Sequence, residues 1–264
     1  MSHTGEPLRL GAVVQKASSL DAAENRAALD AVADVLEPDT GLVLLPEAFM
    51  RDFGAPDTDL ASTAEPLDGP FVDRLTAFAC DRDTTVVAGM FETSDDPARP
   101  WNTLVVVDRD GLRASYKKIH LYDSFGYKES DRLVAGPVEP VLVDVGGFRV
   151  GLMTCYDLRF PELARELVGR GAELLVLPAA WVAGPGKVHH WRTLATARAI
   201  ENTAYVAAVG QPGPRYTGHS LVVGPAGELV AELGDGDHVL AATIDHDTLE
   251  QARATNPSLA NRRF

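Results

Sequence analysis

The sequence predicts an α/β fold with mixed sheets, formed by a single domain over residues 1–264. Apolar runs of strand length recur along the whole chain, and amphipathic stretches of helix length lie between them. No Pro- or Ser-rich linker, internal repeat or low-complexity segment divides the chain. With 45% hydrophobic and 23% charged residues, the composition is that of an ordinary globular protein.

Most of the strand-like runs are apolar at consecutive positions, which indicates strands that are covered on both faces. These runs lie at 8–15, 41–47, 84–91, 102–109, 149–154, 173–179, 204–210, 220–225 and 239–245. The segment SLVVGPAGELVAEL predicts a hairpin that turns at Pro225-Ala226-Gly227. Antiparallel pairs are therefore expected beside parallel ones.

Amphipathic stretches at 18–36, 70–82, 161–170 and 187–202 predict helices that cover the sheets. In the second stretch, Phe71, Leu75 and Phe78 recur at i, i+4 and i+7 and form one apolar face. Leu20 is assigned to the corresponding face of the first stretch. Cys80, near the end of the second stretch, is interpreted as a small buried side chain.

The charge balance argues against several classes of partner. Lys and Arg total 24 against 38 Asp and Glu, a net charge of −14, and no basic run exceeds two residues. We therefore expect no nucleic-acid or membrane partner. The start MSHTGEPLRLGAVVQ predicts no signal peptide, and two cysteines form no disulfide framework, so a cytoplasmic location is expected.

Cys155 in GLMTCYDLRFPEL follows an apolar strand and precedes a helix that Pro161 opens. A tight turn there would place the sulfur near backbone N–H groups and lower the thiol pKa. The alternative is a buried apolar side chain. A catalytic thiol needs a base, but no histidine lies in a cysteine-protease signature. His189 and His190 would point about 100° apart on a helix, so no metal site is expected.

Two other charged positions follow apolar strands. Glu47 comes directly after GLVLLP, and Lys117 and Lys118 close the run in ASYKKIHLYD. A partly desolvated carboxylate suits a general base, and an inward-pointing lysine suits a developing oxyanion. Each alone is more typical of a solvated loop. Three such residues at strand ends predict a site, because functional groups in α/β folds gather at the carboxyl ends of strands.

The segments LLPEAF, YKKIHLYD and GLMTCYDLRFPEL resemble the three motifs of the nitrilase superfamily of carbon–nitrogen hydrolases. The resemblance continues through GAELLVLPAAW, HHWRTLATARAIENTAYVAA, GHSLVVGPAGE and the closing NRRF. It implies a nitrilase-type α-β-β-α sandwich that works without cofactor or metal. It also implies a homodimer or higher homo-oligomer, formed through the helices that cover the sheets.

The same resemblance implies a role for each site residue. Glu47 would deprotonate Cys155, which would attack an amide carbonyl and form a thioester. Lys118 and the backbone N–H of Tyr156 would hold the oxyanion, and Glu129 in YKESDRL would orient Lys118 and the substrate amide. Ammonia would leave, and water activated by Glu47 would hydrolyse the thioester.

Four motifs, TCYDLRFPEL, LPAAWVAGP, HHW and NRRF, are most similar to the bacterial deaminated glutathione amidase branch. The implied substrate is a small ω-amide such as deaminated glutathione, hydrolysed at its terminal amide. The alternatives are an ω-amidase acting on α-ketoglutaramate, an N-carbamoyl amino acid hydrolase, and a non-catalytic scaffold with the same fold. Nitriles are disfavoured, because Cys-Tyr-Asp stands where true nitrilases usually carry Cys-Trp-Glu.

Two further residues are candidates for substrate binding. Arg159 lies at the offset from the nucleophile where family carbamoylases use an arginine, and its guanidinium suits a carboxylate. The alternative is an ion pair with Asp157 or Glu162 that shapes the turn. Trp181 ends a strand and is expected either to wall the pocket or to pack in the core.

Overall fold

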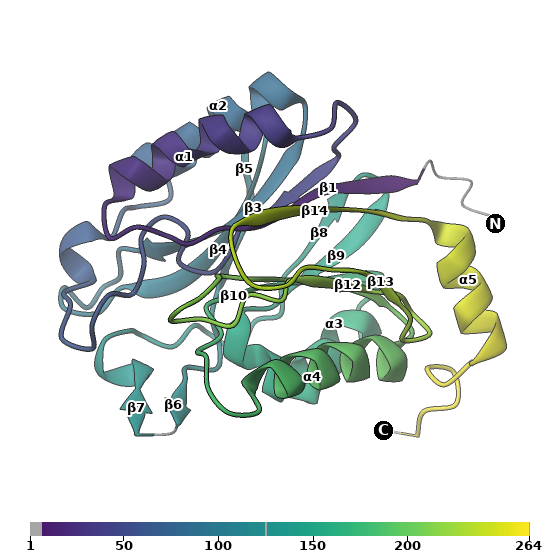
Figure 1. The fold of residues 1–264 in the computed structure, drawn as a ribbon. Coiled ribbons are helices and arrows are strands. Elements are labelled where there is room, and N and C mark those ends of the chain that lie inside the picture. The colour runs from purple at the N-terminus through teal and green to yellow at the C-terminus, as the bar shows by residue number, and fades with distance from the viewer. Residues whose placement is uncertain (1–6, 125, 264) are drawn as a thin grey trace.

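The computed structural model describes residues 7–124 and 126–263. Residues 1–6, which belong to the segment from which no signal peptide is predicted, lie outside the described residues. Phe264 of the NRRF motif also lies outside them. The described residues form two six-stranded sheets, with helices on the outer face of each sheet (Figure 1). This arrangement confirms the α/β prediction with mixed sheets and the α-β-β-α sandwich that the resemblance implies.

The first sheet contains β1 (Leu8–Gln15), β2 (Leu42–Leu44), β3 (Thr85–Glu92), β4 (Trp101–Asp108), β5 (Gly111–Lys117) and β14 (His238–Ile244). Its strand order is β14-β1-β2-β3-β4-β5. β1, β2 and β3 are parallel, whereas β4 runs antiparallel to both β3 and β5. The carboxyl ends of β2 and β5 and the amino end of β4 therefore lie at one edge of the sheet.

The second sheet contains β8 (Leu142–Val145), β9 (Phe148–Leu152), β10 (Leu174–Ala179), β11 (Tyr205–Gly210), β12 (Leu221–Val223) and β13 (Leu229–Glu232). Its order is β13-β12-β11-β10-β9-β8, and β9, β10 and β11 are parallel. β12 and β13 form the expected hairpin, whose turn is closed by the bond from Gly224 N to Glu228 O. A separate small hairpin joins β6 (Asp123–Ser124) to β7 (Tyr127–Lys128).

Helices α1 (Ala22–Val35) and α2 (Pro70–Arg82) cover the first sheet, and α3 (Pro161–Gly169) and α4 (Lys187–Asn202) cover the second (Figure 1). Pro70 and Pro161 open their helices, where a proline loses no helical hydrogen bond. The C-terminal helix α5 (His246–Thr255) is capped by Asp245, whose carboxylate accepts a hydrogen bond from Thr248 N. Three short 3-10 helices are η1 (Ala61–Thr63), η2 (Glu129–Asp131) and η3 (Cys155–Arg159).

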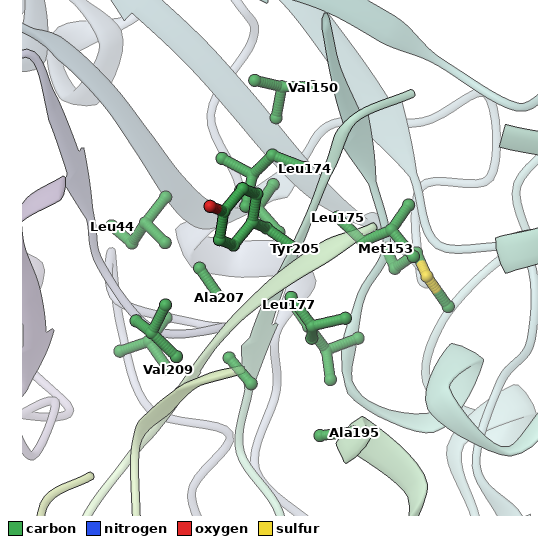
Figure 2. Close-up of a cluster of buried hydrophobic side chains, with 14 of the residues drawn as sticks. Leu44, Val150, Met153, Leu174, Leu175, Leu177, Ala195, Tyr205, Ala207 and Val209 are labelled. Atoms are coloured by element: carbon green, nitrogen blue, oxygen red, sulfur yellow. The ribbon is translucent and has the colours of Figure 1, made fainter. Parts of the chain in front are cut away.

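Two apolar cores hold the layers together. Under α2, Phe71, Leu75 and Phe78 pack in one buried cluster with side chains of β3 and β4. Burial of such a side chain stabilises the fold by about 1.5–3 kcal/mol. The second core includes the space between the sheets, where Leu44 of β2 lies in one cluster with Tyr205 of β11 (Figure 2). The sheets are thus apolar on both faces, as the consecutive apolar runs predict.

The structure corrects two expectations about side chains. Cys80 is exposed, because it lies about 200° around α2 from Phe78 and so points away from the apolar face. Leu20 is 54% exposed and precedes the first turn of α1. None of the helices in the described ranges is long and apolar enough to cross a membrane.

Candidate active site

Three strand ends bring Glu47, Lys118 and Cys155 together at one cavity, as the sequence predicts. Glu47 follows β2, Lys118 follows β5 of the same sheet, and Cys155 follows β9 of the other sheet. All three line a cavity of about 490 Å³, together with Glu129 of η2. The nucleophile candidate and its charged neighbours therefore meet only where the two sheets face each other.

Three donors fix the carboxylate of Glu47, which is 1% exposed. Its Oε1 accepts hydrogen bonds from Nζ of Lys118 over 2.9 Å and from Nδ2 of Asn102 over 2.7 Å. Its Oε2 accepts one from the backbone N–H of Ala180, just beyond β10, over 2.6 Å. The carboxylate thus has one orientation, set by groups from both sheets.

Backbone packing places Glu47 against β3. A Cβ atom at Gly89 would lie 2.5 Å from the backbone nitrogen of Ala48 and 2.7 Å from Cα of Glu47, so only glycine fits there. The carbonyl oxygen of Glu47 accepts a hydrogen bond from Nε2 of Gln211 over 2.9 Å. Gln211 follows β11 and was missed in the sequence, although it also is a polar residue after an apolar strand.

Lys118 lies between two buried carboxylates. Its Nζ is 2.9 Å from Oε1 of Glu47 and 2.9 Å from Oε2 of Glu129. Burial acts to lower the pKa of Lys118, but the charges of Glu129 and Glu47 outweigh it and hold that pKa well above the ordinary value. Burial raises the pKa of Glu129, against the opposing charge of Lys118. The backbone N–H of Tyr122 fixes the other carboxylate by donating to Oε2 of Glu129 over 2.6 Å.

Cys155 is the first residue of η3, where the backbone φ is +45° and the side chain is 7% exposed. A tight turn thus follows the strand, which is the condition under which the sequence leads us to expect a lowered thiol pKa. The expected lowering of the thiol pKa is wrong. Burial, and next the charge of Glu47, raise the pKa of Cys155 well above its ordinary value. The thiol is therefore protonated at neutral pH.

A buried carboxylate holds the turn that carries Cys155. Asp157 accepts hydrogen bonds from Tyr116 Oη over 2.7 Å and from the backbone N–H of Thr154 over 2.8 Å. Nδ1 of His120 lies 2.7 Å from the other oxygen of Asp157. Sequence reasoning did not assign Asp157 to this role. The only sequence signal for this role is the position of Asp157, two residues after the candidate nucleophile.

Aromatic side chains form much of the cavity wall. Trp181 lines the cavity and is also buried, so both alternatives for it apply. Tyr156 lines the cavity, and its ring meets that of Tyr122 edge to face at 5.0 Å. Other aromatic lining residues are Phe53, Tyr127 and Tyr216. A largely apolar wall with a few placed polar groups is typical of sites that bind small molecules.

Arg159 does not make the ion pair proposed for it. Among the described residues, no carboxylate of Asp157 or Glu162 lies within 4.0 Å of its guanidinium. Its Cζ instead lies 5.0 Å from the ring centroid of Trp181, and its Nη2 is 3.4 Å from Nδ1 of His190. Residues 7–124 and 126–263 contain no cluster of three or more possible metal ligands, and His190 therefore belongs to none.

Comparison with known proteins identifies the family of the chain. The carbon–nitrogen hydrolase family model matches residues 11–254. Deaminated glutathione amidase from Escherichia coli O157:H7 is 42% identical over 234 residues, which cover 88% of each chain. The 2-oxoglutaramate amidase of Paenarthrobacter nicotinovorans is 35% identical and covers 97% of this chain and 90% of its own.

A solved structure shares the whole fold. It is a carbon–nitrogen hydrolase superfamily protein from Xanthomonas campestris with an arsenic adduct in its active site. It matches with a TM-score of 0.88 at 30% identity, over 98% of both chains. The chain therefore belongs to the carbon–nitrogen hydrolase family of the nitrilase superfamily, and it is a hydrolase of carbon–nitrogen bonds other than peptide bonds.

Proposed function

We propose that the chain is a cofactor-free thiol amidase in which Cys155 is the nucleophile and Glu47 the general base. One observation carries this proposal: the buried thiol of Cys155 lies beside a carboxylate that three donors hold in place. Glu47 takes the thiol proton as sulfur attacks the amide carbonyl carbon. The raised pKa of Cys155 fits this order, because the thiol stays protonated until it attacks.

Charge that develops on the carbonyl oxygen needs donors near Cys155. We assign this task to Nζ of Lys118 and the backbone N–H of Tyr156, and we assign to Glu129 the positioning of Lys118 and the amide. The tetrahedral adduct then collapses, the C–N bond breaks, and Glu47 returns the proton to the leaving nitrogen. Water, deprotonated by Glu47, cleaves the thioester and regenerates the thiol.

For the substrate, we propose deaminated glutathione first and 2-oxoglutaramate second. Relatives named for these substrates are 42% and 35% identical to this chain. Both molecules carry the same 2-oxoglutaryl acyl group, so either would form the same thioester on Cys155. A cavity of about 490 Å³ lies within the range for ligands larger than a five-carbon amide, which favours the first.

The leaving groups of the two substrates differ. Glutathione has no primary carboxamide, so its deaminated form would release the amine of a Cys-Gly dipeptide. Ammonia is the product only for 2-oxoglutaramate. The expectation of ammonia release thus applies to the second substrate, whereas 2-oxoglutarate is the acyl product of both.

Domain, assembly and location are also proposals. We propose one domain over 1–264, since the second core joins strands from both ends of the described chain, such as Leu10 and Ile244. We propose a homodimer through the face of α4 and β13, where Ile200, Leu229 and Val230 are exposed. Sedimentation of the wild type and of Leu229→Asp tests the dimer.

The two free cysteines and the acidic charge balance support a cytoplasmic location.

The function is tested by release of 2-oxoglutarate from each substrate by wild type, Cys155→Ala and Cys80→Ala. We expect release by wild type and Cys80→Ala, and none by Cys155→Ala, with the fold preserved. Full activity of Cys155→Ala would overturn the proposed nucleophile. Turnover of N-carbamoyl amino acids alone would assign the carbamoylase alternative, and no turnover of any amide would favour the scaffold.

A further inference from the structure

In the part of the chain that the structure describes, three cationic side chains line the cavity. Lys118 lies between Glu47 and Glu129, as described above. Nη1 of Arg215 lies 2.9 Å from Oδ1 of Asp52. The third is Lys187, the first residue of α4. Its neighbourhood differs, because another cation lies close to it.

Lys187 and Arg159 lie near the same indole ring. Nζ of Lys187 is 5.7 Å and Cζ of Arg159 is 5.0 Å from the ring centroid of Trp181. Nζ of Lys187 also donates a hydrogen bond to Tyr122 Oη over 3.2 Å. Trp181 and Tyr122 line the cavity, so the ammonium group lies at its wall.

The two charges repel each other. Burial, and next the charge of Arg159, lower the pKa of Lys187. Within the described part of the chain, Arg159 makes no ion pair within 4.0 Å, and its buried Nε has no hydrogen-bond partner. An anion at this wall would relieve the repulsion. Cys155 lines the same cavity as Lys187, so such an anion would lie in the cavity that holds the nucleophile.

We propose that Lys187 binds the carboxylate of the substrate's acyl group, with Arg159 adding positive potential near the Trp181 ring. This inference rests on the proposed amidase function and names the substrate class that the site selects: an ω-amide whose acyl chain ends in a carboxylate. Both proposed substrates carry this carboxylate on the acyl side of the scissile bond. Lys187 then determines specificity, while Glu47, Lys118 and Cys155 perform the chemistry.

A matched pair of amides tests this proposal. 2-Oxoglutaramate and 4-oxopentanamide share the amide and the keto group, but the second has a methyl group in place of the carboxylate. We expect wild type to prefer 2-oxoglutaramate in kcat/KM. In Lys187→Met that preference falls roughly 10- to 100-fold, mainly through KM, because a charge-assisted contact is lost. Lys187→Arg retains most of the preference, and Lys16→Met, which removes a surface lysine outside the cavity, retains all of it.

Equilibrium binding separates this inference from the proposed function. Calorimetry with Cys155→Ala and with the double variant Cys155→Ala/Lys187→Met measures affinity for the same two amides without turnover. If the double variant binds 2-oxoglutaramate more weakly than Cys155→Ala does, but binds 4-oxopentanamide equally well, the anion site is supported. That conclusion holds even if the wild type hydrolyses neither amide. Absence of hydrolysis would overturn only the proposed function. Equal affinities in both proteins, or loss of the preference in Arg159→Met but not in Lys187→Met, would overturn the role of Lys187.

Discussion

The side-chain amide of Asn102 donates a hydrogen bond to Oε1 of Glu47 over 2.7 Å, from β4, which runs antiparallel to the strand that precedes Lys118. Asn102 is buried, and its Nδ2 also lies 3.5 Å from Oε1 of Glu129. It therefore bridges the two carboxylates that flank Lys118. This neutral donor keeps the base oriented without adding charge.

Asn102→Ala should lower kcat more than it raises KM. Glu47 would lose one of its three donors and with it part of its fixed orientation, which we expect to cost roughly 10- to 100-fold in kcat. Asn202→Ala removes another buried asparagine, in α4, and should lower stability while kcat stays close to the wild-type value. Steady-state kinetics and urea unfolding of both variants measure this. Equal kcat in the two variants would contradict the role of Asn102.

Glu47→Gln should separate thiol ionisation from catalysis. The charge of Glu47 helps to raise the pKa of Cys155, so its removal should lower that pKa. We expect iodoacetamide labelling of Cys155 to begin at lower pH in Glu47→Gln, while amide hydrolysis is lost. Mass spectrometry in a Cys80→Ser background removes the exposed thiol from the measurement. Glu92→Gln, a second buried glutamate substitution, should leave the labelling profile unchanged, and an unchanged profile in Glu47→Gln would refute the electrostatic link.

Lys118→Met should destabilise the fold by about 3–5 kcal/mol at alkaline pH, because two buried carboxylates lose their cation. The deficit should shrink as pH falls. Burial raises the pKa of Glu129, so the folded variant takes up a proton before the unfolded chain does. In the wild type, the contribution of Lys118 is present below the ordinary lysine pKa and is lost only as pH rises through the raised one.

Urea unfolding at alkaline and mildly acidic pH measures the effect of Lys118→Met. Lys16→Met is its control, because Lys16 is partly exposed and pairs with the exposed Asp237 over 3.4 Å. The control should cost only about 0–1 kcal/mol, with little change between the two pH values. A pH-independent deficit in Lys118→Met would show that its carboxylate partners do not cause it.

Asp157→Ala should reduce activity and stability together. The turn at Cys155 would lose the acceptor for Tyr116, Thr154 and His120, and the positive φ at Cys155 would lose its support. We expect a loss of about 3 kcal/mol or more. Tyr116→Phe removes one of these hydrogen bonds, so it should cost only about 1–2 kcal/mol and leave kcat within a few-fold. Similar losses of kcat in both variants would contradict this ranking.

The sequence predicts the centre of the site because its members share one signal. Glu47, Lys118 and Cys155 each follow an apolar strand, and such ends converge when the strands are parallel. Asn102 lies at the amino end of β4, and only the antiparallel register of that strand brings it to the same edge. A rule based on carboxyl ends cannot find it. The Ala180 donor is equally hidden, because a backbone N–H carries no sequence signature.

The elements of the fold also differ in how clearly the sequence predicts them. Apolar periodicity predicts α2 closely, since its buried face repeats regularly. The strands β8 and β13 carry exposed positions and give weaker signals. The expected pKa of Cys155 was wrong because the sequence shows the helix start, but not the burial of the thiol or the carboxylate that faces it. Only the packing of the two sheets brings those groups together.

The origin of Glu47 and Cys155 in different sheets has a consequence during protein synthesis. The ribosome releases Glu47 and Lys118 well before Cys155, and Gln211, which holds the backbone of Glu47, emerges later still. Until the last of these segments has folded, the sulfur has no assembled base beside it. A nascent chain therefore carries a thiol that cannot hydrolyse an amide, and catalytic competence marks the completed polypeptide.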